Sequence, residues 1–135
     1  MRDRSLSNRL RVQDKVILVT GAAGRLGSAI VSALTNNGAL VIATDRDLGG
    51  CESKCRSSAE VCLALDVTQQ DDWDSVLAEI ANRFGRLDAL VNAASLHIAA
   101  PLNELSLADF RAQNDVNAIG SYRGVRAGVL AMRQH

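Results

Sequence analysis

The sequence feature that most constrains the fold is a glycine-rich segment between an apolar run and a helical pattern. Residues 15–20, KVILVT, lack the polar alternation of a half-exposed strand and are typical of a strand buried on both faces. Gly21, Gly24 and Gly27 follow at once, and apolar residues recur at helical spacing from Arg25 onward. The pattern predicts a buried strand, a tight turn and a helix, the first unit of a parallel α/β sheet.

Strands and helices continue to alternate along the chain. Thr68 with Asp71, and Ser106 with Asp109, match the capping-box pattern that begins a helix. The second of these helices is expected to run nearly to the end of the chain, with a kink near Asn117. Further buried strands are expected at residues 39–44, 61–65 and 87–91. Because parallel strands joined by helices need right-handed crossovers, we predict an α/β fold with a Rossmann-type doubly wound parallel sheet, incomplete, with about four strands in the order 3-2-1-4.

Length and composition indicate one soluble globular domain. At 135 residues the chain allows one compact unit, which we place at residues 13–135 after a flexible tail at residues 1–12. Fifteen basic and fifteen acidic residues balance, which argues against nucleic acids and membrane surfaces as partners. No run reaches the ~20 apolar residues of a membrane span, and no apolar run of a signal peptide opens the chain. We therefore expect a cytoplasmic protein.

The cysteines do not indicate a disulfide framework or a metal centre. Cys51, Cys55 and Cys62 are odd in number, which is typical of a protein from a reducing compartment. A zinc site built on the first two would need two more ligands, and no nearby His or Cys pair has the spacing of zinc ligands. We therefore expect no metal and interpret the thiols as structural.

The glycine turn has the chemistry of a diphosphate site. Glycines allow the backbone to approach a diphosphate closely, and the first-turn N–H groups of the following helix then face the anion. Asp45 lies at roughly the expected ~20-residue interval, where a carboxylate accepts from the ribose of a dinucleotide. A mononucleotide P-loop is excluded because the segment lacks Gly-Lys-Ser/Thr. A packing turn without a ligand, and an Asp45 that only caps the following loop, remain as alternatives.

Four motifs, in the right order, resemble those of the short-chain dehydrogenase/reductase family. Residues 20–27 are similar to its glycine motif in the Gly-x-x-Gly-x-x-Gly spacing, and Asp66-Val67 is similar to its Asp-Val pair. Residues 90–95, LVNAAS, resemble its Leu-Val-Asn-Asn-Ala-Gly stretch, and residues 115–117, DVN, resemble the segment with the active-site Asn. The resemblance implies a nicotinamide dinucleotide as cofactor and hydride transfer between it and a small alcohol or carbonyl substrate.

The resemblance also implies roles for single residues. Asp66 is expected to accept from the adenine amino group, or else to act only as a turn acceptor before Thr68. Asn92 is expected to bridge neighbouring strands and to border the cofactor. Asn117 is expected to be catalytic, because the carbonyl freed by a helix kink would hold a water of the proton relay. The expected cofactor-binding residues are Gly21, Gly24, Arg25, Leu26, Gly27, Asp45, Arg46, Asp66, Val67, Asn92, Ala93 and Ala94.

Departures from the family pattern bear on activity. Ala93 and Ser95 replace an Asn and a Gly near the nicotinamide end, and a residue other than glycine is strained there if its φ is positive. The family's catalytic Ser and Tyr-x-x-x-Lys pair do not occur in the 135 residues, and Tyr122 with Arg126 follows Asn117 too closely to be that pair. We therefore interpret the chain as the cofactor-binding half, truncated before the catalytic segment, and expect it to be inactive alone.

NAD is expected in preference to NADP. Asp45 can accept from both ribose hydroxyls of NAD but would repel the 2′-phosphate of NADP. Two like unit charges ~4 Å apart repel by about 4 kcal/mol at an effective dielectric of ~20. This energy corresponds to a difference of more than about a hundredfold in affinity. Arg25 and Arg46 oppose this preference, because a guanidinium can offset a phosphate.

Another class of function remains open, a non-catalytic NAD-binding sensor or subunit-interaction module. A methyltransferase on a similar sheet is disfavoured by the three-glycine pattern. Gly120, Gly124 and Gly128 recur every four residues, which predicts a smooth helical ridge that either packs on the sheet or forms a subunit interface. The second alternative would make the protein a homo-oligomer through its C-terminal helix. His97 is interpreted as a solvated loop residue.

Overall fold

The computed structural model describes residues 11–133, and the flexible tail expected at residues 1–12 lies outside this range except for its last two residues. Strands and helices alternate as predicted. In chain order the elements are β1 (Val16–Thr20), α2 (Arg25–Asn36), β2 (Leu40–Asp45), α3 (Leu48–Cys55), β3 (Val61–Ala64), α4 (Gln70–Phe84), β4 (Ala89–Val91), α5 (Leu107–Asn114), η1 (Asp115–Gly120) and α6 (Ser121–Met132).

The four strands form one parallel sheet in the order β3-β2-β1-β4, which confirms the predicted topology. β1 lies inside the sheet, with Val16 opposite Leu40 of β2 and Ile17 opposite Ala89 of β4. All of β1 is buried, as its unbroken apolar pattern predicts. Because the strands are parallel, their carboxyl ends meet at one edge, where ligands bind in sheets of this type.

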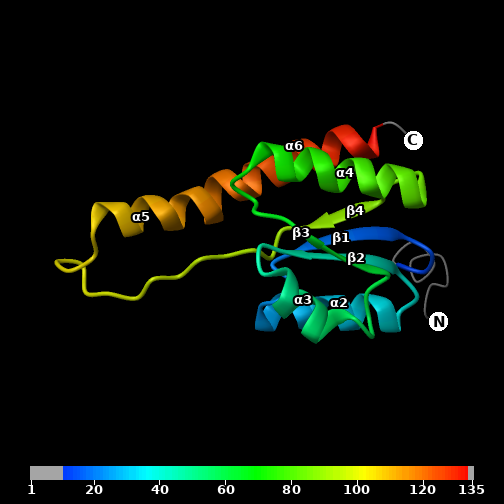
Figure 1. The fold of residues 1–135 in the computed structure, drawn as a ribbon, viewed down its shortest axis with the longest axis horizontal. Helices are drawn as coiled ribbons and strands as arrows, with labels where there is room; N and C mark the ends of the chain where they lie inside the picture. The colour runs from blue at the N-terminus through cyan, green and yellow to red at the C-terminus, as the bar shows by residue number, and fades with distance from the viewer. Residues whose placement is uncertain (1–10, 134–135) are drawn as a thin grey trace, which may run out of the picture.

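Helices cover both faces of the sheet, which makes it doubly wound (Figure 1). Successive side chains of β1 point to opposite faces. Val16 and Leu18 belong to a core cluster that includes Trp73 of α4, whereas Ile17 and Val19 belong to a second cluster that includes residues of α2 and α3. Helices α4 and α6 contact each other over the first cluster, and α2 and α3 contact each other over the second.

Helix α3 was not expected, because residues 46–58 are mostly polar and contain two adjacent glycines. Asp47 caps the helix: its Oδ1 accepts from the Gly50 N–H at 3.0 Å. The helix buries Cys51 and Cys55, which lie one turn apart, in the cluster shared with α2. Since these two small thiols are its only buried residues, the helix shows little apolar periodicity.

The capping box expected at Thr68 is wrong, although the helix that follows is present and buries its apolar face. The N-cap of α4 is Gln69, and no side chain caps this end. The Thr68 hydroxyl donates instead to Asp66 Oδ1 at 2.7 Å. Asp66, in the loop after β3, thus fixes Thr68 within that loop, and the helix begins one residue later than the pattern predicts.

The start of the long C-terminal helix is confirmed, because Ser106 Oγ accepts from the Asp109 N–H at 3.0 Å. At Asn117, where a kink was expected, the backbone forms the π-helical segment η1 and then continues as α6. α5 projects beyond the sheet and buries no residue, whereas α6 lies over the sheet (Figure 1). None of the helices within residues 11–133 has the length and apolar character needed to cross a lipid bilayer.

The glycine ridge brings α6 close to β4, so its predicted packing on the sheet is confirmed. A Cβ added at Gly124 would lie 2.3 Å from Asn92 Oδ1, and one added at Gly128 would lie 3.1 Å from Leu90 Cδ2. At the first distance, a Cβ would force the Asn92 side chain or the helix to move. Glycine at these positions therefore sets how deeply the helix approaches the carboxyl end of the sheet.

Asp88 fixes the start of β4 against β1. Its Oδ2 accepts from the Val16 N–H at 2.8 Å, and Lys15 Nζ and Arg86 Nε lie 3.4 Å and 3.1 Å from its carboxylate oxygens. Burial alone would raise the pKa of Asp88, but the Val16 N–H and the two cations outweigh burial and hold the pKa below its usual range. The ionised form of Asp88 therefore stabilises the fold.

Candidate functional site

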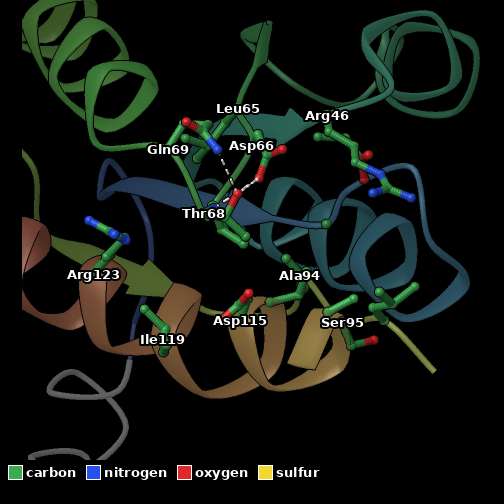
Figure 2. A pocket seen from close by; sticks show the side chains of 16 residues that line it. Arg46, Leu65, Asp66, Thr68, Gln69, Ala94, Ser95, Asp115, Ile119 and Arg123 are labelled. Atoms are coloured by element: carbon green, nitrogen blue, oxygen red, sulfur yellow. Dashed lines mark hydrogen bonds between the residues drawn. The ribbon is translucent and has the colours of Figure 1, made fainter. Parts of the chain in front are cut away.

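A cavity of about 520 Å³ lies at the edge of the sheet where the strands end (Figure 2). Its walls come from the ends of β1 and β2, the loops after β3 and β4, and the helical stretch from α5 to α6. This volume falls within the range of small-molecule and cofactor sites. Of the residues expected to bind a cofactor, the cavity brings together Gly21, Asp45, Arg46, Asp66, Val67 and Ala94.

The glycine turn after β1 forms part of the cavity wall through Gly21. Gly21 has φ +68°, and a Cβ there would lie 2.5 Å from the Cα of Ala94. A Cβ at Gly27 would lie 2.1 Å from the Gly21 carbonyl oxygen. Gly24 is the N-cap of α2 and offers no side-chain acceptor to the first-turn amides. Those amides therefore depend on water or a ligand for an acceptor. Gly24, Arg25, Leu26 and Gly27 belong to this turn but do not line the cavity.

Thr20 is the last residue of β1 and begins the glycine motif, but the motif does not predict a role for its side chain. Its buried hydroxyl accepts from the N–H groups of Ala93 and Ala94, each at 3.1 Å, and lies 3.5 Å from the Val91 carbonyl oxygen. The hydroxyl thus ties the loop after β4 to the glycine turn. Only the register of β1 against β4 reveals this role, because the partners lie 73 and 74 residues further along the chain.

Asp45 joins the glycine turn to the loop after β2. Its Oδ2 accepts from the Ala23 N–H at 2.9 Å, and its Oδ1 accepts from the Asp47 N–H at 3.0 Å. The second bond confirms that Asp45 also caps the following loop. Each carboxylate oxygen can accept more than one hydrogen bond, so Asp45 keeps capacity for a further donor in the cavity. Arg46 lines the cavity next to it, whereas Arg25 does not.

Asp66 lines the same cavity and also accepts hydrogen bonds within the loop after β3. Its Oδ1 accepts from the Thr68 N–H at 2.9 Å and from the Thr68 hydroxyl at 2.7 Å, which confirms the turn-acceptor role for this oxygen. Thr68 and Gln69 also line the cavity and were not expected there. Figure 2 shows Asp66, Thr68 and Gln69 grouped on one side, opposite Ala94 and Asp115.

Asn92 and Asn117 do not line the cavity. Nδ2 of Asn92 donates toward the Ser121 carbonyl oxygen at 3.4 Å, so this side chain contacts α6. Asn117 makes a two-point contact with Leu96, because Nδ2 donates to its carbonyl oxygen and Oδ1 accepts from its N–H, both at 2.8 Å. The Asn117 carbonyl oxygen, expected to be freed for a water, accepts from the Ser121 hydroxyl at 2.8 Å. Asn117 therefore anchors the segment after β4.

The substitutions near Asn92 do not strain the backbone. Asp14 is the only residue other than glycine with a positive φ in the described part of the chain, so Ser95 adopts an ordinary conformation. Ser95 lines the cavity, whereas Ala93 does not. His97 is exposed in the loop after β4, as predicted, and Tyr122 is exposed on α6; neither lines the cavity.

Arg123 of α6 is a lining residue that sequence reasoning missed. Its Nε is shielded from solvent and has no hydrogen-bond partner within residues 11–133, while Nη1 donates to Gln70 Oε1 at 3.4 Å. Its only sequence signal is helical spacing from Val116 and Ile119, which line the same wall. The cavity thus contains a cationic donor without an acceptor.

The thiols lie behind the glycine turn and outside the cavity. Burial raises the pKa of Cys51 and of Cys55, and the neighbouring Cys62 raises both further. Cys55 Sγ donates to the Ala22 carbonyl oxygen at 3.5 Å. The three thiols are free, and residues 11–133 contain no cluster of three metal-binding side chains.

The cavity and the glycine turn beside it leave several polar groups without a partner. The glycine turn leaves no room for a Cβ at two positions, and the amides after it have no side-chain acceptor. Arg123 Nε is shielded from solvent and lacks an acceptor. Asp66, at a different wall of the same cavity, has a carboxylate oxygen that can accept from a ligand. A ligand with an anionic centre and a polar base would satisfy all of these groups.

Comparisons with known proteins agree with this geometry. The family model described as short chain dehydrogenase matches residues 15–135. L-fucose dehydrogenase of Mus musculus is 36% identical over 126 residues, which cover 92% of this chain and 46% of that protein. D-threitol dehydrogenase of Mycolicibacterium smegmatis is 36% identical over 117 residues, which cover 83% and 45%. The chain spans about half the length of the curated relatives it matches.

Solved structures of short-chain reductases and dehydrogenases also match nearly all of this chain and about half of their own length. The 3-ketoacyl-(acyl-carrier-protein) reductase from Brucella melitensis, complexed with NADH, superposes with a TM-score of 0.83 at 26% identity and covers 91% of this chain and 52% of that chain. A glucose/ribitol dehydrogenase of the short-chain type from the same organism gives a TM-score of 0.84 at 27% identity, with 90% and 53% covered.

Proposed function

Because the chain belongs to the short-chain dehydrogenase family, we propose that its cavity binds NAD and that it forms the cofactor-binding half of an oxidoreductase acting on a small alcohol or carbonyl compound. The observation that carries the proposal is the N-terminus of α2 beside the cavity, where the first-turn amides have no side-chain acceptor. Gly21 and Gly27 pack closely against backbone atoms and hold the turn tight, and unpaired amides that follow such a turn suit a diphosphate.

The diphosphate is proposed to lie at the N-terminus of α2. The first-turn amides of α2 point out of the helix, and the helix dipole adds positive potential at this end. No acidic residue occurs in the first turn of α2, so nothing there repels an anion. The Ala23 N–H is already bound to Asp45 and is not available to the diphosphate.

The ribose of the adenosine is proposed to bind Asp45, and this carboxylate favours NAD over NADP. Asp45 lines the cavity and is held by two backbone amides, which fixes its position. A 2′-phosphate would approach a fixed negative charge. Arg46 follows Asp45 directly and lines the same cavity, so its guanidinium reduces this repulsion, and we expect a preference for NAD rather than exclusion of NADP.

Hydride transfer to or from an alcohol or carbonyl requires catalytic groups that do not occur in the 135 residues. When bound, a nicotinamide dinucleotide accepts or donates a hydride. We propose that Asn117 acts as a positioning residue, since it holds Leu96 and thereby shapes the segment that borders the cavity. The 135 residues contain no Tyr-x-x-x-Lys pair, so we propose that this polypeptide alone binds the dinucleotide without appreciable turnover.

Titration of the purified chain with NADH and NADPH, followed by calorimetry or nicotinamide fluorescence, tests the proposal. Asp45→Ala should weaken NADH binding about tenfold and reduce the preference for NADH over NADPH. Glu60→Ala, which removes an exposed carboxylate outside the cavity, is the matched control and should leave both affinities unchanged. Absence of binding by the folded wild-type chain would refute the proposal.

A second candidate function is a non-catalytic module that binds NAD and pairs with another copy of this chain. The outer side of α6 favours it, because Tyr122, Val125, Val129 and Leu130 are between 42% and 65% exposed. An apolar face on one helix can pair with itself about a two-fold axis. Light scattering after size exclusion tests this candidate: Val125→Asp should shift a dimer to monomer, and a monomeric wild-type chain would refute it.

A further inference from the structure

We propose that Arg123 recognises the adenine base of the dinucleotide by donating from Nε to a ring nitrogen beside the amino group. This inference rests on the proposed binding of NAD. Figure 2 shows Arg123 at one end of the cavity and Arg46 at the other, with Thr68 between them. Because Arg46 and Asp45 lie at the ribose end, Arg123 lies where the base of an adenosine would reach.

The first step of the argument is the unsatisfied donor. Arg123 Nε is buried without a partner, and the contact of Nη1 with Gln70 is long at 3.4 Å. None of the salt bridges formed within residues 11–133 includes this guanidinium. Arg123 is half-buried, and a shielded N–H without an acceptor is costly, so the position favours a ligand with an acceptor atom.

The second step is an acceptor on the same cavity. Both hydrogen bonds from Thr68 go to Oδ1 of Asp66, and no described residue donates to Oδ2. The cavity therefore presents a free carboxylate oxygen and a free guanidinium N–H that do not pair with each other. A ligand that carries a donor beside an acceptor would satisfy both.

The third step explains how Arg123 reaches the cavity. Gly120, the last residue of η1, and Gly124 of α6 lie on either side of Arg123 in the sequence. A Cβ at Gly120 would lie 2.6 Å from Val67 Cγ2, and a Cβ at Gly124 would lie 2.3 Å from Asn92 Oδ1. The lack of a Cβ at these glycines allows the helix to lie close to the loop after β3 and the end of β4. Arg123 is therefore positioned by packing that does not depend on its own side chain.

Adenine matches this pair of groups. Its amino group donates, and the ring nitrogens N1 and N7 on either side of that group accept. With the amino group at Asp66, one of these nitrogens faces the Arg123 side of the cavity. Hypoxanthine carries a carbonyl oxygen in place of the amino group and an N–H at N1, but it keeps N7 as an acceptor. Comparison of the two bases therefore identifies which nitrogen Arg123 contacts.

Fluorescence titrations with NADH and with the reduced hypoxanthine dinucleotide test the inference in four proteins: wild type, Arg123→Met, Arg123→Lys and Arg126→Met. Arg126 is exposed on the same helix and outside the cavity, so its variant makes the same change of charge without the contact. We expect Arg123→Met to weaken NADH binding about tenfold, and Arg126→Met to change it less than twofold.

The remaining readouts separate a base contact from other roles. Arg123→Met should leave the thermal midpoint unchanged or raised, because it removes an unsatisfied donor. If Arg123 contacts N1, the variant loses little affinity for the hypoxanthine dinucleotide; if it contacts N7, both ligands lose equally, and both results support the inference. Full rescue by Arg123→Lys would indicate general charge attraction and overturn it, as would unchanged NADH binding by Arg123→Met. A wild type that binds neither ligand would refute the proposed function itself.

Discussion

Replacement of Thr20 by valine removes one hydroxyl from the junction of β1, the glycine turn and the loop after β4. The side chain is 1% exposed, so valine keeps the volume and loses only the polar group. Two backbone amides, those of Ala93 and Ala94, then lose their acceptor. The change tests whether this hydroxyl holds together two segments that are distant in the sequence.

The expected cost follows from the unpaired amides. A buried donor without an acceptor costs about 1–3 kcal/mol, and these two amides belong to half-buried residues, so water recovers part of the loss. We expect Thr20→Val to lower the free energy of unfolding by about 3 kcal/mol. For a chain of this length the loss corresponds to about 10 °C in Tm.

Thr44→Val is the matched control, because Thr44 pairs with Thr20 in the sheet register and is equally buried. Its hydroxyl makes a single hydrogen bond, to the Val19 carbonyl oxygen at 3.0 Å, so the variant should lose only about 1 kcal/mol. Urea unfolding followed by circular dichroism measures both variants. Equal losses would refute the reasoning, because they would show that the two orphaned amides carry no penalty of their own.

Three further predictions concern other parts of the molecule. Gly27→Ala places a Cβ 2.1 Å from the Gly21 carbonyl oxygen, so α2 must shift and NADH affinity should fall at least tenfold in titrations; unchanged affinity would contradict the proposed diphosphate site. Asp88→Asn should lower stability at pH 7 by about 1 kcal/mol and flatten the pH dependence. Since the folded pKa of Asp88 is depressed, wild type loses this stability only as pH falls below about 4, and equal acid sensitivity of both proteins in thermal melts would exclude the role. Asn117→Ala should speed proteolysis near Leu96 by removing its two-point anchor, and an unchanged cleavage rate would argue against that anchor.

Local patterns in the sequence were sufficient to predict the sheet and the turn. A continuous apolar run predicts a strand buried on both faces, and the strand order follows from the alternation of strands with helices. The glycine turn was predictable because Gly21 and Gly27 lack a Cβ that the backbone has no room for. Asp45 and Asp66 were predictable because Asp45 ends β2 and Asp66 closely follows β3, and the carboxyl ends of parallel strands meet at one edge.

The tertiary structure decided which side chains meet at that edge. Thr20 and the amides it accepts from are more than 70 residues apart, so no local pattern links them. Thr68 fits a helix cap by sequence, yet its hydroxyl donates to Asp66 and accepts from the Gln69 side chain, and the helix begins one residue later than the pattern predicts. Arg123 enters the cavity only because neighbouring glycines allow α6 to approach the sheet. Backbone conformation is thus set by residues adjacent in sequence, whereas the composition of the site depends on packing between elements.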